Sequence, residues 1–210
     1  MLKVDYFVYQ RKHSKIRKVV MPAKTTATPT RQRILDAANR LFYAQGIRAT
    51  SADKIIEEVG ITKVTFYRHF RNKNELVVAY LQAQAQQESS WFSSMHNPKD
   101  PLGSLEAVAA GIGTASCAPG FRGCAFINAA AEYFDAGDPV REVVDAHRGW
   151  MLNEFAAIAS DAGAEYPAQV ARQLMLLRDG AMVNGYLGEA AEVAGALAEA
   201  FSTVLSAAIA

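Results

Sequence analysis

The chain of 210 residues is long enough to bury a complete hydrophobic core, either as one large domain or as two smaller ones. Its two cysteines, Cys117 and Cys124, belong to no CxxC or Cys/His cluster, which excludes a disulfide framework and a structural zinc site. The net charge of +1 conceals an asymmetry, because residues 1–80 hold 16 basic and 6 acidic residues, whereas residues 81–210 hold 6 and 15. We therefore expect a module that binds a polyanion, with nucleic acid as the leading partner and a solvated basic surface as the alternative.

The N-terminal segment, residues 1–29, is basic at first and then rich in Thr, Pro and Ala, which predicts a flexible arm. Its longest apolar stretch, from Val4 to Tyr9, is short and contains Asp5, unlike a signal peptide or a membrane span. We expect a cytoplasmic protein without a membrane segment. Met21 is an alternative start of the chain.

Three short helices are predicted after the arm, over residues 31–45, 52–59 and 63–70. Apolar residues fall on one face of each, and Gly46 and Gly60 supply helix ends. Thr50, Ser51 and Thr62 are suitable N-caps, and the expected inward residues are Ile34, Ala38, Leu41, Phe42, Ile55, Ile56, Val59, Phe66 and Phe70. The tight connection between the second and third helices predicts a helix-turn-helix.

A long helix is expected to begin near Asn72 and to run toward Trp91. Beyond Pro98 the spacing stays helical, with Pro and Gly breaks that leave helices over residues 102–117, 123–134, 139–161, 167–187 and 189–208. Alternating strand patterns are absent from the sequence. We therefore expect an all-α protein.

The third short helix has a surface available to a partner, because Phe66 and Phe70 occupy its buried side. That surface consists of Lys63, Val64, Thr65, Tyr67 and Arg68. A helix of this kind enters the DNA major groove, where its N-terminal positions reach base edges and flanking polar groups bind phosphates. Arg and Lys donate to guanine, and a Val or Thr methyl contacts the thymine methyl.

Residues 50–76 resemble the tetracycline-repressor (TetR) family closely. The resemblance rests on the ordered combination of Gly60, the run Phe66-Tyr67-Arg68-His69-Phe70, and Lys73 before Glu75-Leu76, and it is strong over about residues 30–80. Two departures from the family pattern are notable. Ile56 and Val59 replace small alanines, which predicts wider packing of the two short helices, and Val64 replaces Gly, Ala or Pro, which predicts a shifted base preference.

The resemblance implies a DNA-binding domain at residues 30–76. Base or groove contacts are implied for Lys63, Val64, Thr65, Tyr67 and Arg68, and phosphate contacts for Thr50, Tyr67, His69 and Lys73. Ser51, next to Thr50, completes the expected DNA-binding set. The expected partner is double-stranded operator DNA, bound by a homodimer whose two recognition helices read a pseudo-palindrome.

The resemblance also implies a helical domain at residues 77–210 that binds a ligand and dimerises. Small and apolar residues in the last two helices predict a four-helix dimer interface. The expected effector is small and apolar or aromatic, and no cofactor or metal is expected. The candidate ligand-binding residues are polar or aromatic side chains among apolar neighbours, although each is also suited to a core position: Trp91, Phe92, Phe126, Asn128, Tyr133, His147, Trp150, Met151, Arg178 and Met182.

Two candidates carry further expectations. Arg178 lies in a Leu-rich helix, so it should pair with Glu132, Asp179 or an anionic ligand, unless it simply faces outward. Cys117 and Cys124 are expected to be buried, inert thiols, with a redox switch as the alternative.

The sequence favours a ligand-responsive transcriptional regulator, most often a repressor in this family. An architectural DNA-binding protein needs only the basic half and leaves the acidic domain unexplained. A helical enzyme is the third hypothesis, in which His147, Glu132 and Cys124 form a catalytic set, but no local motif supports it.

Overall fold

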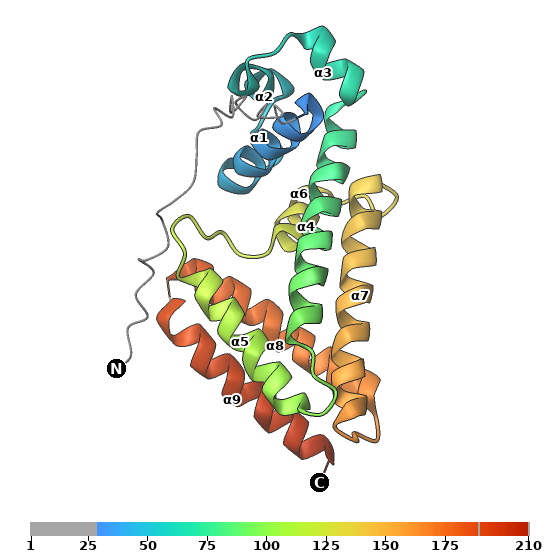
Figure 1. The fold of residues 1–210 in the computed structure, drawn as a ribbon, viewed down its shortest axis with the longest axis vertical. Coiled ribbons are helices and arrows are strands. Elements are labelled where there is room, and N and C mark those ends of the chain that lie inside the picture. Colours follow the sequence, from blue (N-terminus) through green and yellow to red (C-terminus); the bar gives the residue numbers. More distant parts are fainter. Residues whose placement is uncertain (1–28, 189, 210) are drawn as a thin grey trace, which may run out of the picture.

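A computed structural model describes residues 29–188 and 190–209, so all but the last residue of the expected arm, together with Met21, lies outside the described residues. The described residues form nine α-helices and no strand, which confirms the all-α prediction (Figure 1). Three short helices gather at one end, and a helical bundle occupies the other. The long helix α4, Lys73–Met95, runs from one end toward the other.

The three short helices are α1, Thr30–Gln45, α2, Ala52–Val59, and α3, Lys63–His69. Their bounds match the predicted ones to within a residue, because the predicted caps are formed. The Ser51 hydroxyl accepts a hydrogen bond from the Lys54 amide, and the Thr62 hydroxyl accepts one from the Thr65 amide, both at 3.1 Å. Each bond satisfies an amide that a helix start leaves without an intrahelical partner.

Helix α4 ends four residues later than predicted. Asn72 caps its start by accepting from the Glu75 amide at 2.8 Å, and His96 follows its last residue. The expected end at Trp91 was too early, because Ser93 and Ser94 continue the helix; the Ser94 hydroxyl donates to the Trp91 carbonyl at 2.6 Å. Such local bonding lets serine remain in a helix interior.

The remaining helices are α5, Pro101–Ser116, α6, Ala125–Glu132, α7, Pro139–Asp161, α8, Pro167–Leu187, and α9, Ala190–Ile209. Helix α6 is shorter than the predicted 123–134. Gly123 has a φ of +75°, and Cys124 has extended backbone, so the helix begins only after them. Tyr133, also extended, ends it.

Two clusters of buried side chains form the core. The first joins α1 to α3 with the start of α4, and it continues into α6 and α7 through Phe126, Ala129 and Val140. The second lies among α5, α7, α8 and α9. The proposed domain boundary after residue 76 therefore falls within α4, in a core that both sides share.

Helix α9 packs along α5 at close range. A Cβ at Gly113 of α5 would collide with Ala194 of α9, so glycine permits the close approach of these two helices. By length and composition α9 is also apolar enough to cross a membrane, with a mean hydropathy of 1.4. One side of the helix, including Val193, Leu197, Phe201 and Leu205, is buried in the second core, as in a core helix of a helical domain.

The two cysteines are free, and they lie in different surroundings. Cys124 is buried at the start of α6, whereas Cys117 is exposed. The expectation of two buried thiols is therefore wrong for Cys117. This residue follows the last turn of α5 at the chain surface, where its thiol lies 3.6 Å from the Ala190 carbonyl.

Candidate nucleic-acid interface

Helix α3 presents one open face and one buried face. Phe66 is fully buried beneath it, whereas Lys63 and Arg68 are exposed. Val64 and Tyr67 are 70% and 48% exposed, which is unusual for side chains with so much apolar surface. The fold therefore leaves a mixed apolar and cationic surface uncovered, with the chemistry needed to read base edges and thymine methyl groups.

Lys63 is already paired in the structure. Its ammonium lies 2.9 Å from the Asp53 carboxylate of α2, and both side chains are mostly exposed. The hydrogen bond and the negative charge of Asp53 raise the pKa of Lys63 above its ordinary value. A DNA phosphate or base must compete with Asp53 for this ammonium, at small cost because exposed ion pairs are weak.

Thr50 is one of the residues for which the resemblance implies a phosphate contact, and in the structure its hydroxyl is bonded within the protein. Thr50 is fully buried, and its hydroxyl donates toward the Gly46 and Leu41 carbonyls at 2.9 and 3.3 Å. The hydroxyl instead ties the loop between α1 and α2 to the end of α1. Its neighbour Ser51 is exposed and caps α2.

His69 and Lys73 flank the end of α3 and are half-buried. The Lys73 ammonium lies 3.5 Å from the Arg48 carbonyl, at the edge of the loop between α1 and α2. Burial lowers the pKa of Lys73, and the negative charge of Glu132 opposes part of that effect. The Lys73 side chain is thus held beside a backbone carbonyl at the start of α4.

Three exposed arginines near these helices were not predicted: Arg31, Arg48 and Arg71. The Arg31 guanidinium lies 4.9 Å above the Phe70 ring, and that of Arg48 lies 5.9 Å from the Phe134 ring. The only sequence signal for them is the basic excess of residues 1–80, which does not single out positions.

The helical bundle contains cavities that a small molecule can enter. One cavity of about 530 Å³ lies between α4 and α7, and His147 and Trp150 contribute to its lining. One of about 230 Å³ lies between α1 and α6 and includes Asn128. These volumes approach or reach the size of small-ligand sites.

A cavity of about 300 Å³ lies where α1, one of the three N-terminal helices, meets the helical bundle. We call it the junction cavity. Its lining combines side chains of α1, α4, α8 and the segment around the start of α6, including Asn39, Tyr43, Gln84, Phe121, Phe126, Arg178 and Met182. Three of the predicted ligand-binding residues, Phe126, Arg178 and Met182, therefore meet at one site.

A network of charged side chains borders the junction cavity, and two of its members, Arg178 and Glu88, form part of the cavity wall. Arg178 is 2% exposed and lies 2.7 Å from Glu88 and 3.2 Å from Asp179. The Glu88 carboxylate also lies 2.8 Å from the Nε2 atom of His147. The Asp179 carboxylate lies 2.8 Å from the Arg148 guanidinium. Of the partners predicted for Arg178, Asp179 is confirmed, whereas the pairing with Glu132 is wrong. Nothing in the sequence singles out Glu88, which is 90 residues from Arg178.

The network favours a charged Glu88. Burial by itself raises the pKa of this carboxyl, but the hydrogen bond of His147 and the charge of Arg178 lower it, and the net pKa lies below the ordinary glutamate value. The His147 ring also stacks on Phe126, with ring centroids 3.5 Å apart and the planes 5° from parallel. The wall thus links α4, α6, α7 and α8.

The other predicted ligand-binding residues line none of these three cavities: Trp91, Phe92, Tyr133 and Met151. Phe92 and Met151 are core residues of the bundle, with exposed fractions of 0% and 2%. Trp91 occupies the space beside Gly111, and the Tyr133 hydroxyl donates to Asn74 at 3.2 Å. These positions are filled by packing and hydrogen bonding within the protein.

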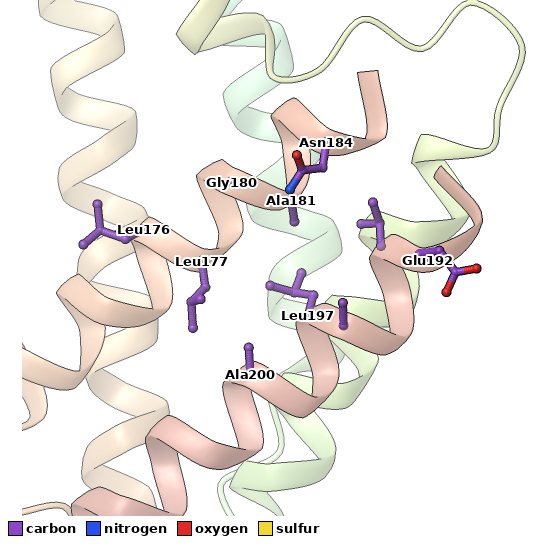
Figure 2. A pocket seen from close by; sticks show the side chains of 10 residues that line it. Leu176, Leu177, Gly180, Ala181, Asn184, Glu192, Leu197 and Ala200 are labelled. Carbon is purple, nitrogen blue, oxygen red and sulfur yellow. The ribbon is translucent and has the colours of Figure 1, made fainter. Parts of the chain in front are cut away.

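Helices α8 and α9 share an apolar groove on the outside of the bundle (Figure 2). Leu176, Leu177 and Gly180 line it from α8, and Leu197 and Ala200 line it from α9. Leu176 is 72% exposed, and Val183 and Leu187 on the same helix are 45% and 72% exposed. An apolar surface of this kind marks an interaction site.

A capped α2, a tight turn and an α3 with a cationic and apolar open face define a helix-turn-helix DNA-binding protein. Residues 34–80 match the family model described as bacterial regulatory proteins, tetR family. The HTH-type transcriptional regulator TtgR of Pseudomonas putida is 36% identical over 92 residues, which span 43% of this chain and 44% of that protein. This match therefore covers less than half of the curated relative.

Solved structures match nearly the whole described chain. SCO4454, a TetR-family transcriptional regulator from Streptomyces coelicolor, is 36% identical with a TM-score of 0.82, over 86% of this chain and 96% of that one. A putative TetR-type regulator from Streptomyces avermitilis is 27% identical with a TM-score of 0.76, over 86% and 98%. The chain belongs to the TetR family of helix-turn-helix transcriptional regulators, a family of DNA-binding proteins and not of enzymes.

Proposed function

We propose that this regulator is a cytoplasmic repressor that binds a palindromic operator as a homodimer and is released by a small molecule. The observation that carries the proposal is the exposed α3 surface on a capped helix-turn-helix, combined with the junction cavity, which is lined by α1 and by helices of the C-terminal bundle. The DNA-binding domain comprises residues 30–76 and the effector and dimerisation domain residues 77–210. An architectural protein has no use for such a cavity.

We assign the DNA contacts according to exposure. Lys63, Val64, Tyr67 and Arg68 stand open on α3, with half-buried Thr65 among them, and they read the major groove. Ser51, His69 and Lys73 bind phosphates at its edges, where they fix the register of the protein on DNA. The exposed Arg31, Arg48 and Arg71 add phosphate contacts.

The dimer forms through α8 and α9. The groove between them and the exposed Leu176, Val183 and Leu187 offer an apolar surface that a second copy covers with the same surface. A second pair of helices packed here completes a four-helix interface. It places one recognition helix on each side of a two-fold axis, as a palindromic site requires.

The effector occupies the junction cavity. Phe121, Phe126 and Met182 offer apolar and aromatic contacts, whereas Tyr43 and Asn39 belong to α1 of the DNA-binding domain. The charges of the cavity wall are already paired, which favours a neutral aromatic ligand over a charged one. A ligand that binds here contacts both domains, so it changes their relative position if it prefers one arrangement.

A ligand screen tests this proposal. Compounds that raise the thermal unfolding temperature of the purified protein are added to its complex with duplex DNA, and the affinity for DNA is measured by fluorescence anisotropy. We expect active compounds to weaken DNA binding by about 5-fold to 150-fold, the typical range of allosteric coupling. The Phe126→Ala variant should lose this response. Compounds that stabilise the protein but leave DNA affinity unchanged would contradict the proposed mechanism.

A further inference from the structure

A carboxylate of the C-terminal domain holds the backbone of the DNA-binding domain. Glu132, the last residue of α6, accepts hydrogen bonds from the amides of Ile47 and Arg48, at 2.9 and 2.5 Å. Both amides belong to the loop between α1 and α2. Two bonds to one charged group are stronger than bonds between neutral partners.

The loop has a shape that fits this carboxylate. Gly46, directly before Ile47, has a φ of +92°, and a Cβ added to it would lie 3.2 Å from the Glu132 Oε1 atom. Glycine therefore gives the carboxylate room and adopts a backbone conformation that other residues rarely take. Thr50, with its buried hydroxyl, fixes the other end of the same loop.

The segment before α6 is tied to the same part of α1. The Tyr43 hydroxyl donates to the Gly123 carbonyl and accepts from the Arg122 amide, both at 2.9 Å. The Arg122 guanidinium donates to the Ala44 carbonyl at 2.9 Å, near the end of α1, where the helix dipole favours a cation. The junction cavity is lined by Tyr43 and Gly123, so these bonds border the proposed effector site.

The held loop leads directly to the DNA-binding surface. The Arg48 amide donates to Glu132, its side chain is exposed, and its carbonyl accepts from the Lys73 ammonium at 3.5 Å. The position of the loop therefore determines where the cations of Arg48 and Lys73 stand relative to each other. A phosphate requires both at a fixed spacing to bind them together.

We propose that Glu132 is a positioning residue for DNA binding: its carboxylate fixes the loop between α1 and α2 so that Arg48 and Lys73 meet the same stretch of DNA backbone. The contact makes this arrangement depend on the position of α6. The assignment of Arg48 and Lys73 to phosphates rests on the proposed function, whereas the contact of Glu132 with the loop does not.

The sign of the effect separates this role from simple electrostatics. Glu132 is a negative charge near a surface that binds a polyanion, so its removal should strengthen DNA binding if only charge mattered. The positioning role predicts the opposite, because Glu132→Gln loses one of the two acceptors and places an amide donor against a backbone donor. Glu132→Asp keeps the charge but shortens the reach, and it should lose affinity as well.

The experiment combines two measurements on the full-length protein. Hydrogen–deuterium exchange of the Ile47 and Arg48 amides reports the contact, and fluorescence anisotropy with a labelled duplex selected on the wild-type protein reports DNA binding. We expect exchange in Glu132→Gln to be about tenfold faster at these two amides, which corresponds to about 1.4 kcal/mol, and affinity to fall at least about fivefold. Amides of α5 and α9 should be unaffected.

Glu106→Gln is the matched control, because Glu106 is exposed on α5 and its substitution removes the same charge. It should change neither measurement. Unchanged exchange at Ile47 and Arg48, or unchanged or increased DNA affinity in Glu132→Gln, would overturn the proposal. So would loss of folded structure in both Glu132 variants, seen by circular dichroism, which would assign the residue a purely structural role. If the wild type selects no duplex, the proposed function fails, and the exchange rates still decide whether Glu132 holds the loop.

Discussion

We expect individual side chains on α3 and at the start of α4 to have different roles in DNA recognition. Arg68 is exposed on the recognition helix, whereas Lys73 lies at the start of α4 beside the loop between α1 and α2. Contacts to base edges carry sequence information, and contacts to phosphates do not. The two residues should therefore fail in different ways when they are replaced.

Lys73→Ala should weaken binding to all DNA sequences and reduce the dependence of affinity on salt by roughly one per half-site. The physical reason is the loss of one phosphate contact and its released counterion. Affinity measured over a series of salt concentrations, with two unrelated duplexes, checks this expectation. A loss confined to one sequence would contradict the phosphate assignment.

Arg68→Ala should chiefly relax sequence preference. A bidentate contact between arginine and guanine discriminates by about 1–3 kcal/mol against a wrong base. Competition between the selected operator and single-base variants measures that discrimination at each position. An equal loss of affinity for every variant would instead place Arg68 on a phosphate.

Residue chemistry in the helix-turn-helix was predictable because its determinants are local. Ser51 and Thr62 each cap a helix by accepting a hydrogen bond from the amide three residues further along the chain, and Phe66 and Phe70 lie one helical turn apart. Glu132 was expected to pair with Arg178 and Glu88 was not assigned at all, because their actual partners lie 59 to 90 residues away along the chain. A carboxylate in a helix gives no sequence signal for which distant backbone or cation it will meet. Thr50 shows the converse, since tertiary packing buries a hydroxyl that looked available.

At the scale of helices, α3 depends on the side chain beneath it. Phe66 is fully buried, and its ring packs against Tyr67 and Phe70, with centroids 5.2 and 6.2 Å away. Phe66→Ala should lower the free energy of unfolding by about 3–5 kcal/mol through lost burial and the cavity left behind. Denaturant unfolding measures this change. Val64→Ala, on the exposed side of the same helix, is the control and should alter stability little.

The contact of α4 with α7 and α8 predicts a pH dependence. The folded protein lowers the pKa of Glu88, so its contribution to stability is present above the ordinary glutamate pKa, about 4.3, and is lost as the pH falls through the lower folded value. Glu88→Gln should therefore be less stable than wild type at neutral pH, and the difference should shrink in acid. Denaturant unfolding of both proteins at neutral pH and at acidic pH tests this prediction. A difference in unfolding free energy that does not change with pH would contradict it.

Helix bounds followed the sequence where a cap or a glycine marks them, as at α2 and α3. They departed from it at α6, where Gly123 and Cys124 precede the helix instead of starting it. The periodicity of an Ala-rich segment is weak, since alanine suits either face of a helix. Cavities were harder still to anticipate, because the junction cavity takes its lining from five helices and a connecting segment.

For the whole molecule, α8 and α9 carry the expected dimer surface. Leu176→Glu places a charge in the groove of Figure 2, where a second copy would have to bury it. We expect this variant to be a monomer at concentrations at which the wild type is a dimer, and to bind DNA more weakly. Analytical ultracentrifugation measures the first effect. Leu102→Glu, an exposed leucine of α5 outside the groove, should remain dimeric.

The first core joins the DNA-binding helices to α6 and α7, and the long α4 extends from one end of the molecule to the other (Figure 1). Movement in the bundle therefore has two routes to the recognition helix, one through α4 and one through the contact of Glu132. In the proposed function, both routes act on a dimer that presents two recognition helices at a fixed spacing. The central claim is that the protein reads DNA in this form.

The most direct test is selection of the purified full-length protein against random duplex DNA, followed by sequencing of the bound pool. The account predicts a palindromic site whose half-sites are about one helical turn apart, 34–36 Å, with enrichment that Arg68→Ala relaxes. Enrichment of a single unrepeated site, or of no sequence at all, would contradict the dimeric operator-binding regulator described here.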